Sequence, residues 1–273
     1  MIRLGVVSFL NARPLVDGLS QRAEVALAYD VPARLGERLI AGEYDAALVP
    51  IVDVLTAPRP LRIISDACIG CDGETMTVRV FSQIPPHRVD RLYADADSHT
   101  SVMLARVIWH ELFGREIVIE PLARGANYGA LQTVLLIGDK VIDPRRGSFA
   151  YEIDLGGAWR QHTGLPFVFA VWAMRDEPQS ADFSRRCAEI EELLESARDR
   201  GQSRAAEIAR EQGPALGWPI ELAERYLCRR LMFKLTPDAI RGGQRFEESC
   251  RSIGLIAPGP ALRWPAQLIE SRR

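Results

Sequence analysis

The chain has 273 residues, 26% of them charged, and a formal net charge of −2 at pH 7. The chain therefore lacks the strong basic bias of most nucleic-acid-binding proteins, which disfavours that class. No apolar stretch approaches the ~20 residues of a membrane-spanning helix. The length suits one large domain or two smaller ones, each with a buried core.

The first fifty residues alternate between strand and helix patterns. The predicted order is a strand at 3–10, a helix at 14–19, a strand at 25–29, a helix from Pro32 to Gly42 and a strand at 45–50. Proline is tolerated in the first turn of a helix, and apolar residues follow Pro32 at helical spacing. This alternation predicts a parallel α/β sheet.

A second α/β unit follows, and then a helical tail. We predict strands at 61–69, 75–81, 91–96, 116–121, 134–139 and 166–174, a helix after Ser101 that runs through Leu112, and tail helices at 182–194, 203–211 and 220–231. Two similar units and a tail predict two lobes. Lobe one is expected from residues 1–80 plus 170–273, and lobe two from 81–169, so that two crossings form a hinge.

Ser8 and Asn11 follow the first predicted strand, at its carboxyl end. Ligands of open α/β sheets bind at this edge, so both side chains are candidate ligand-binding groups. The alternative is that they only cap the first helix, because Ser and Asn are favoured caps. The two interpretations are compatible, since a helix N-terminus itself binds anions.

The segment Asp97-Ser98-His99-Thr100-Ser101 repeats this arrangement in the second unit. Its three hydroxyls and the free N–H groups of a helix start suit a carboxylate, and capping is again the alternative. His99 is the one histidine at this predicted pocket edge, either as a ligand contact or as part of a solvated loop. Gly138 and Asp139 end another strand, where Asp139 is a candidate site residue or a simple turn residue.

The five cysteines are odd in number and scattered, except for Cys68 and Cys71, so a secreted disulfide framework is not predicted. The spacing of that pair alone does not make a metal site, because no second ligand pair follows. We therefore expect no metal and no cofactor. The first residues lack the features of a secretory signal peptide, so we expect the protein in the cytoplasm.

Residues 8–14 read Ser-Phe-Leu-Asn-Ala-Arg-Pro and resemble the SYLNARP opening of the MqnA family, the chorismate dehydratases of the futalosine route to menaquinone. The likeness covers nearly the whole chain. It continues at 29–35, 42–50, 68–73, 78–82, 97–101, 136–139 and 164–172. The chain departs from the family pattern at Cys71 and Thr77, where Ser is usual, and at 131–134, which replace the start of a DAxLLIGD pattern.

The resemblance implies a type II periplasmic-binding-protein-like fold, α/β in class, with a ligand cleft between two lobes. It implies a hydro-lyase that removes water from chorismate and gives 3-[(1-carboxyvinyl)oxy]benzoate. This small anion is then the expected partner, with neither nucleic acid nor membrane. Asn11 and Thr77 are implied as the catalytic pair. The expected substrate-binding residues are Ser8, Asn11, Thr77, Ser98, Thr100, Ser101, Gly138 and Asp139.

The matched motifs contain no obvious protein base. One hypothesis is that the enolpyruvyl carboxylate of the substrate takes the C3 proton, while Asn11 and Thr77 orient it in a closed cleft. A general base such as His99 or Asp139 is the competing hypothesis.

Two other functions stay open. One is a non-catalytic binding protein for an anionic metabolite, since a fold does not fix function. The other is the sister 1,4-dihydroxy-6-naphthoate synthase, whose opening motif differs.

Overall fold

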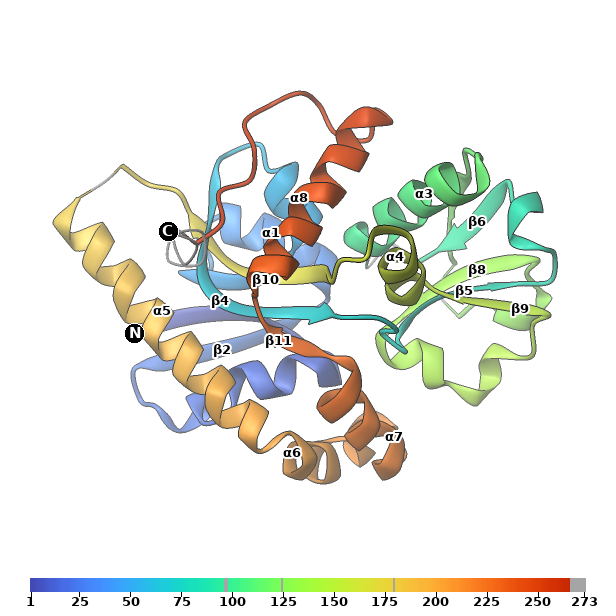
Figure 1. The fold of residues 1–273 in the computed structure, drawn as a ribbon. Coiled ribbons are helices and arrows are strands. Elements are labelled where there is room, and N and C mark those ends of the chain that lie inside the picture. Colours follow the sequence, from blue (N-terminus) through green and yellow to red (C-terminus); the bar gives the residue numbers. More distant parts are fainter. Residues whose placement is uncertain (96–97, 124, 179, 266–273) are drawn as a thin grey trace.

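The computed structural model describes the chain except for residues 96–97, 124, 179 and 266–273. It contains two β-sheets, which lie at opposite ends of the molecule (Figure 1). The larger sheet consists of β1 (Ile2–Val7), β2 (Val25–Asp30), β3 (Ala46–Pro50), β4 (Leu61–Cys71), β10 (Phe167–Arg175) and β11 (Met232–Lys234). The smaller sheet consists of β5 (Val78–Ser82), β6 (Arg91–Ala94), β7 (Val118–Pro121), β8 (Thr133–Ile137) and β9 (Tyr151–Asp154).

Both sheets are mixed. In the larger sheet, in the order β11-β4-β10-β3-β1-β2, strand β1 is parallel to β2 and β3, as the first fifty residues predict. Strand β10 is antiparallel to both β3 and β4. The reason is that β4 leads toward the smaller sheet while β10 returns from it. In the smaller sheet, in the order β7-β6-β8-β5-β9, strands β7, β6 and β8 are parallel, and β5 is antiparallel to both of its neighbours, β8 and β9.

Helices surround both sheets (Figure 1). Those that follow or flank larger-sheet strands are α1 (Pro32–Ile40), α2 (Ile51–Leu55), α5 (Ala181–Ser203), α6 (Ala205–Gln212), α7 (Ile220–Arg225) and α8 (Pro237–Ser252). The smaller sheet carries α3 (His99–Phe113) and α4 (Leu155–Thr163). Two irregular helices matter for the site: the 3-10 helix η1 (Leu10–Val16) and a π-helix at Tyr226–Arg230.

Two helix predictions are wrong in their bounds. The expected helix at 14–19 is the 3-10 helix η1, which begins at Leu10 and therefore includes Asn11. Helix α5 continues to Ser203, well past the predicted end at 194, because its last turns pack on η1. Gly201 makes that approach possible, since a Cβ at this position would collide with the carbonyl of Pro14.

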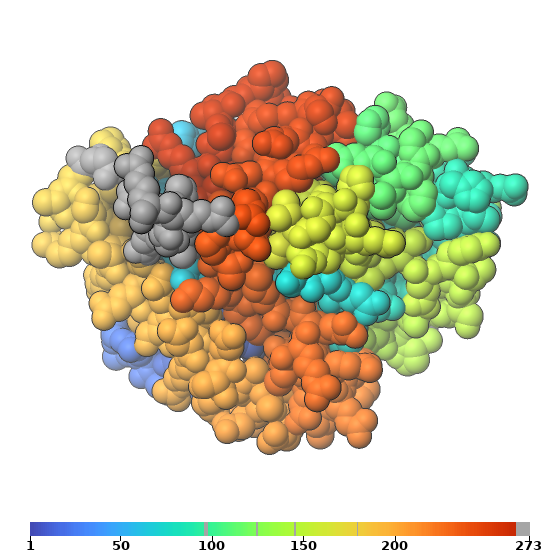
Figure 2. All heavy atoms as spheres, viewed as in Figure 1, coloured from blue at the N-terminus to red at the C-terminus, as the bar shows by residue number. Residues whose placement is uncertain are grey.

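The chain crosses between the sheets twice, at 72–77 and at 155–166. The predicted lobe boundaries, 80/81 and 169/170, fall inside β5 and β10, each of which pairs within one sheet only. Helix α4 occupies the second crossing, and in the space-filling view its atoms lie between those of α8 and α3 (Figure 2). The two sheets are therefore joined on this face by packed side chains.

Candidate active site

A cavity lies where the two sheets face each other. Its walls come from the end of β1 and the start of η1, the first crossing, the start of α3, the end of β8 and the π-helix. Six of the eight predicted site residues line it: Asn11, Thr77, Ser98, Thr100, Ser101 and Gly138. They come from segments far apart in the sequence, and their individual roles stay predictions.

Ser8 and Asp139 do not line the cavity. The backbone N–H of Ser8 donates to the carbonyl of Asp30 at 3.0 Å, and the Ser8 carbonyl accepts from Arg13. Asp139 accepts a hydrogen bond from the indole N–H of Trp218 at 2.7 Å. Burial raises the pKa of this carboxyl, whereas the bond from Trp218 lowers it. Ser8 therefore adjoins the cavity in sequence without lining it, and the Asp139 side chain is directed at Trp218.

The predicted helix starts are not capped by these polar side chains. The residue before η1 is Phe9, and the residue before α3 is Ser98; neither makes a side-chain capping bond. The carboxamide oxygen of Asn11 is buried and has no hydrogen-bond partner in the described part of the chain. A buried acceptor without a partner is costly, which points to a ligand that supplies the donor.

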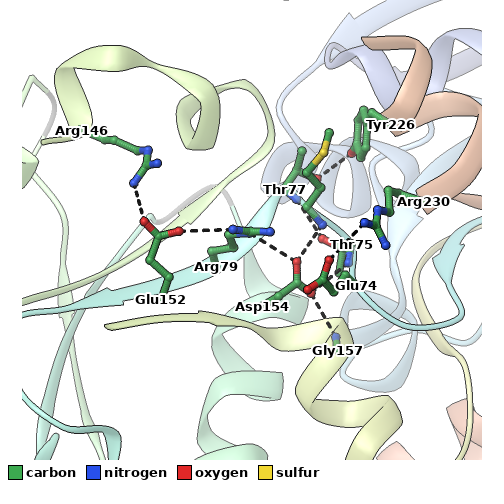
Figure 3. Close-up of polar contacts among 11 residues, drawn as sticks. Glu74, Thr75, Thr77, Arg79, Arg146, Glu152, Asp154, Gly157, Tyr226 and Arg230 are labelled. Carbon is green, nitrogen blue, oxygen red and sulfur yellow. Dashed lines mark hydrogen bonds and ion pairs between the residues drawn. The ribbon is translucent and has the colours of Figure 1, made fainter. Parts of the chain in front are cut away.

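Tyr226 completes the wall that Asn11 and Thr77 form. Its hydroxyl lies 2.7 Å from the Thr77 hydroxyl, and the whole side chain is 1% exposed (Figure 3). Burial raises the pKa of the phenol, and hydrogen bonding with Thr77 and Asn11 partly opposes the rise. The phenol is therefore neutral, and Trp218 stacks on its ring with centroids 4.9 Å apart and planes 7° apart.

Sequence reasoning missed Tyr226, which it placed only within an amphipathic helix at 220–231. A buried tyrosine needs a polar partner, but the sequence does not say which one. The signal that marks Tyr226 is structural, an unusual backbone geometry around it. The wide turn at Tyr226–Arg230 is a π-helix, a feature that often occurs at functional sites.

The opposite wall is the first turn of α3. The hydroxyl of Thr100 donates to the carbonyl of Phe169 at 3.2 Å and lies 3.5 Å from the N–H of Val52, so it joins α3 to the larger sheet. Ser98 and Ser101 are buried at 6% and 2% exposure beside the first N–H groups of the helix, which have no partners within the helix. The positive end of the helix dipole therefore faces the cavity.

His99, which lines the cavity, also contacts helix α2 beside the larger sheet. Its Nδ1 lies 2.7 Å from a carboxylate oxygen of Asp53 in α2. Burial raises the pKa of Asp53, and the bond with His99 opposes that rise. Among the described residues that line the cavity, only His99 and the Tyr226 phenol are titratable. Asp97, from the same sequence motif, lies outside the described residues.

Cys68 and Cys71 are both buried in β4, where burial raises the pKa of each thiol. Within the described ranges, no three His, Cys, Asp or Glu side chains gather in a group that would hold a metal ion. The helices of that same part of the chain include none with the length and apolarity to cross a membrane. The polar groups that line the cavity are hydroxyls, the Asn11 amide and the His99 imidazole.

A family model described as "Menaquinone biosynthesis" matches residues 2–252. The chorismate dehydratase of Thermus thermophilus is 30% identical over an alignment that covers 87% of this chain and 95% of that protein. Among solved structures, a protein of Archaeoglobus fulgidus superposes with a TM-score of 0.72 at 16% identity, over 93% of this chain and 98% of the other. The periplasmic aliphatic sulphonate binding protein SsuA of Escherichia coli gives 0.62 at 11% identity, over 94% of each chain. The fold is thus the periplasmic-binding-protein-like α/β fold.

Proposed function

The chain belongs to the menaquinone biosynthesis family, and from this we propose that it is a chorismate dehydratase, a hydro-lyase. The reaction removes the C3 proton and the C4 hydroxyl of chorismate and yields 3-[(1-carboxyvinyl)oxy]benzoate and water. Formation of the aromatic ring supplies the driving force. The observation that carries the proposal is a mostly apolar cavity that holds a few polar groups, with an unpartnered Asn11 oxygen on one wall and a helix N-terminus on the other.

The two walls suit the two ends of this substrate. A carboxylate at the first turn of α3 would accept hydrogen bonds from backbone N–H groups and from Ser98 or Ser101. The Asn11 oxygen would accept from the substrate hydroxyl, and the Asn11 amide N–H group would face the enolpyruvyl side chain. Apolar residues around these groups, Phe9 and Phe169 among them, exclude water and strengthen each polar contact.

The absence of a charged base among the described lining residues, His99 apart, favours the substrate as its own base. In this scheme the enolpyruvyl carboxylate takes the C3 proton, and the C4 hydroxyl leaves with that proton as water. Asn11 and Thr77 hold the carboxylate near C3, and Tyr226 fixes the Thr77 hydroxyl. The protein thus contributes orientation and desolvation.

His99 is the alternative base that the geometry favours over Asp139. It lines the cavity and pairs with Asp53, an arrangement that orients an imidazole. Asp139 is directed at Trp218 instead. Replacement of His99 by Gln distinguishes the two schemes: with the substrate as base, kcat falls only modestly, whereas loss of a general base costs roughly 10²–10⁴-fold.

The proposed activity is tested by incubating the purified chain with chorismate and following the new aromatic product by chromatography and mass. The Asn11→Ala variant, purified in parallel, controls for spontaneous rearrangement and for contaminating enzymes. Binding of chorismate without product would identify a non-catalytic binding protein. Neither binding nor turnover would direct attention to the naphthoate synthase of the same pathway.

The proposal includes two lobes that close on the substrate, one from residues 1–80 plus 170–273 and the other from 81–169. It also includes a cytoplasmic location. All five cysteines are free thiols, as in proteins of reducing compartments. Recovery of the protein in a periplasmic fraction would contradict that location.

A further inference from the structure

Asp154 lies where the two crossings between the sheets meet. It is the last residue of β9 and stands opposite Arg79 of β5 in the antiparallel ladder. Its side chain therefore reaches the segment just before β5, which contains Thr77. The carboxylate is 7% exposed and sits between the two crossings (Figure 3).

The Asp154 carboxylate accepts hydrogen bonds from three backbone N–H groups. Its Oδ1 accepts from Thr75 at 2.9 Å and from Gly157 at 3.0 Å, and its Oδ2 accepts from Met76 at 2.7 Å. The bond from Gly157 caps α4 in the second crossing. The bonds from Thr75 and Met76 hold the first crossing. Asp154 thus ties both crossings to a single point.

Met76 has a backbone φ of 72° and is buried. Among the described residues it is the only non-glycine in this left-handed region, which a side chain of its kind rarely adopts. The strain persists because the surroundings hold the segment. The next residue is Thr77, whose N–H donates to the Thr75 hydroxyl at 3.0 Å and whose own hydroxyl meets Tyr226.

The Asp154 carboxylate and its three hydrogen bonds form a clamp on the two crossings, and neighbouring contacts support this clamp. Arg79 forms an ion pair with Asp154 at 3.4 Å and also binds Glu152. Gly156 leaves no room for a Cβ against Thr75 and Cys71, so α4 begins directly against the first crossing. Glu74, in that crossing, pairs at 3.3 Å with Arg230, in the π-helix that carries Tyr226 (Figure 3).

We propose that Asp154 is a positioning residue of the active site, because it holds the strained turn at Met76 and so directs the Thr77 hydroxyl toward the cavity. It makes no contact with substrate and acts through Thr77. The inference rests on the proposed function for its activity readout. Its structural readout, exchange of backbone amides, does not depend on that function.

The first test is Asp154→Asn. The amide has one acceptor oxygen in place of two, so at least one of the three backbone N–H groups faces an NH₂ group. We expect kcat for chorismate to fall between about tenfold and a hundredfold, as a small misplacement of a reacting group does. KM should change by less than about threefold, because Asn11 and the first turn of α3 still bind the substrate.

The matched control is Asp45→Asn. Asp45 is a buried carboxylate that accepts from the backbone N–H of Arg3 at 2.8 Å and pairs with Arg3 and Arg186; it precedes β3, whose opposite end, Pro50, lines the cavity. This variant should lose stability without losing kcat. Equal effects of the two substitutions on kcat would overturn the proposal, since the loss would then reflect only a weakened fold.

A double-mutant cycle with Met76→Gly separates positioning from capping. Glycine adopts a positive φ without steric cost, so in the Met76→Gly background Asp154→Asn should reduce kcat by a clearly smaller factor. The same factor in both backgrounds would overturn the proposal, because the α4 cap alone would then explain the loss.

Hydrogen–deuterium exchange of the peptide that covers residues 72–78 supplies the independent readout. Exchange should accelerate in Asp154→Asn and stay unchanged in Asp45→Asn. Unchanged exchange in Asp154→Asn would overturn the clamp, whatever the activity. Faster exchange in a protein whose wild type does not turn over chorismate would sustain the clamp and reject the proposed function.

Discussion

The two walls of the cavity are built in different ways. Asn11, Thr77 and Tyr226 form one wall from side chains, and each depends on a different part of the chain for its position. The other wall is the first turn of α3, where the backbone N–H groups come with the helix itself. A side-chain wall is sensitive to single substitutions, whereas a backbone wall survives most of them. The following variants examine this asymmetry.

Asn11 should show the largest effect. Asn11→Ala removes a hydrogen bond to a charged or reacting group, worth about 1.5–3 kcal/mol, or roughly ten- to a hundredfold in kcat/KM. Asn11→Asp should be worse, because it brings a like charge beside the substrate carboxylate. Chorismate turnover and thermal melting are measured for both. An active and fully stable Asn11→Asp protein would remove Asn11 from the site.

Tyr226→Phe should come next. It leaves the Thr77 hydroxyl without its buried partner, at a cost of about 1–3 kcal/mol, part of which appears in kcat. The ring still stacks on Trp218, so the melting temperature should fall by only a few degrees. The control is Tyr151→Phe, an exposed tyrosine away from the cavity. Full activity in Tyr226→Phe would show that the Thr77 hydroxyl does not depend on the Tyr226 hydroxyl for its orientation.

Substitutions on the α3 wall should have smaller effects. Ser98→Ala and Ser101→Ala each remove one hydroxyl but leave the backbone N–H groups and the helix dipole. We expect a loss of about 0.5–1.5 kcal/mol in kcat/KM for each, at the lower end of the Asn11 range or below it. If either serine matched Asn11→Asp in effect, the two walls would be alike and the contrast between them would be lost.

Asp139→Asn should have the least effect on activity. Its amide oxygen still accepts from Trp218, so kcat should stay within about twofold, whereas loss of a general base would cost far more.

Burial raises the folded-state pKa of Asp139 above its ordinary value of 3.8, so the wild type loses stability as pH rises through that raised pKa. Relative to wild type, the variant should therefore gain stability in urea melts as pH rises from 3.8 through the raised pKa of Asp139. A constant difference across this range would contradict the assignment.

Some features of the fold followed from local pattern. Alternating strand and helix periods at residues 1–50 predicted the parallel arrangement of β1, β2 and β3, because each period fixes which face of a segment is buried. The antiparallel course of β10 did not follow, since an apolar run reads the same in either direction. The extension of α5 to Ser203 was missed too, because its final turns pack through small residues such as Gly201.

For the candidate site, too, some features followed from local sequence and others only from the tertiary fold. By itself the sequence determined the local chemistry: an amide and hydroxyls at strand ends, and a helix that follows the hydroxyl cluster at 98–101. Tertiary structure alone decided which groups meet. It directed Asp139 to Trp218, brought Tyr226 onto Thr77, and placed Asp154 beneath the Met76 turn. The physical reason is range: propensity and periodicity act over a few residues, whereas these contacts join positions about 80 or more residues apart, and only the packed fold selects among them.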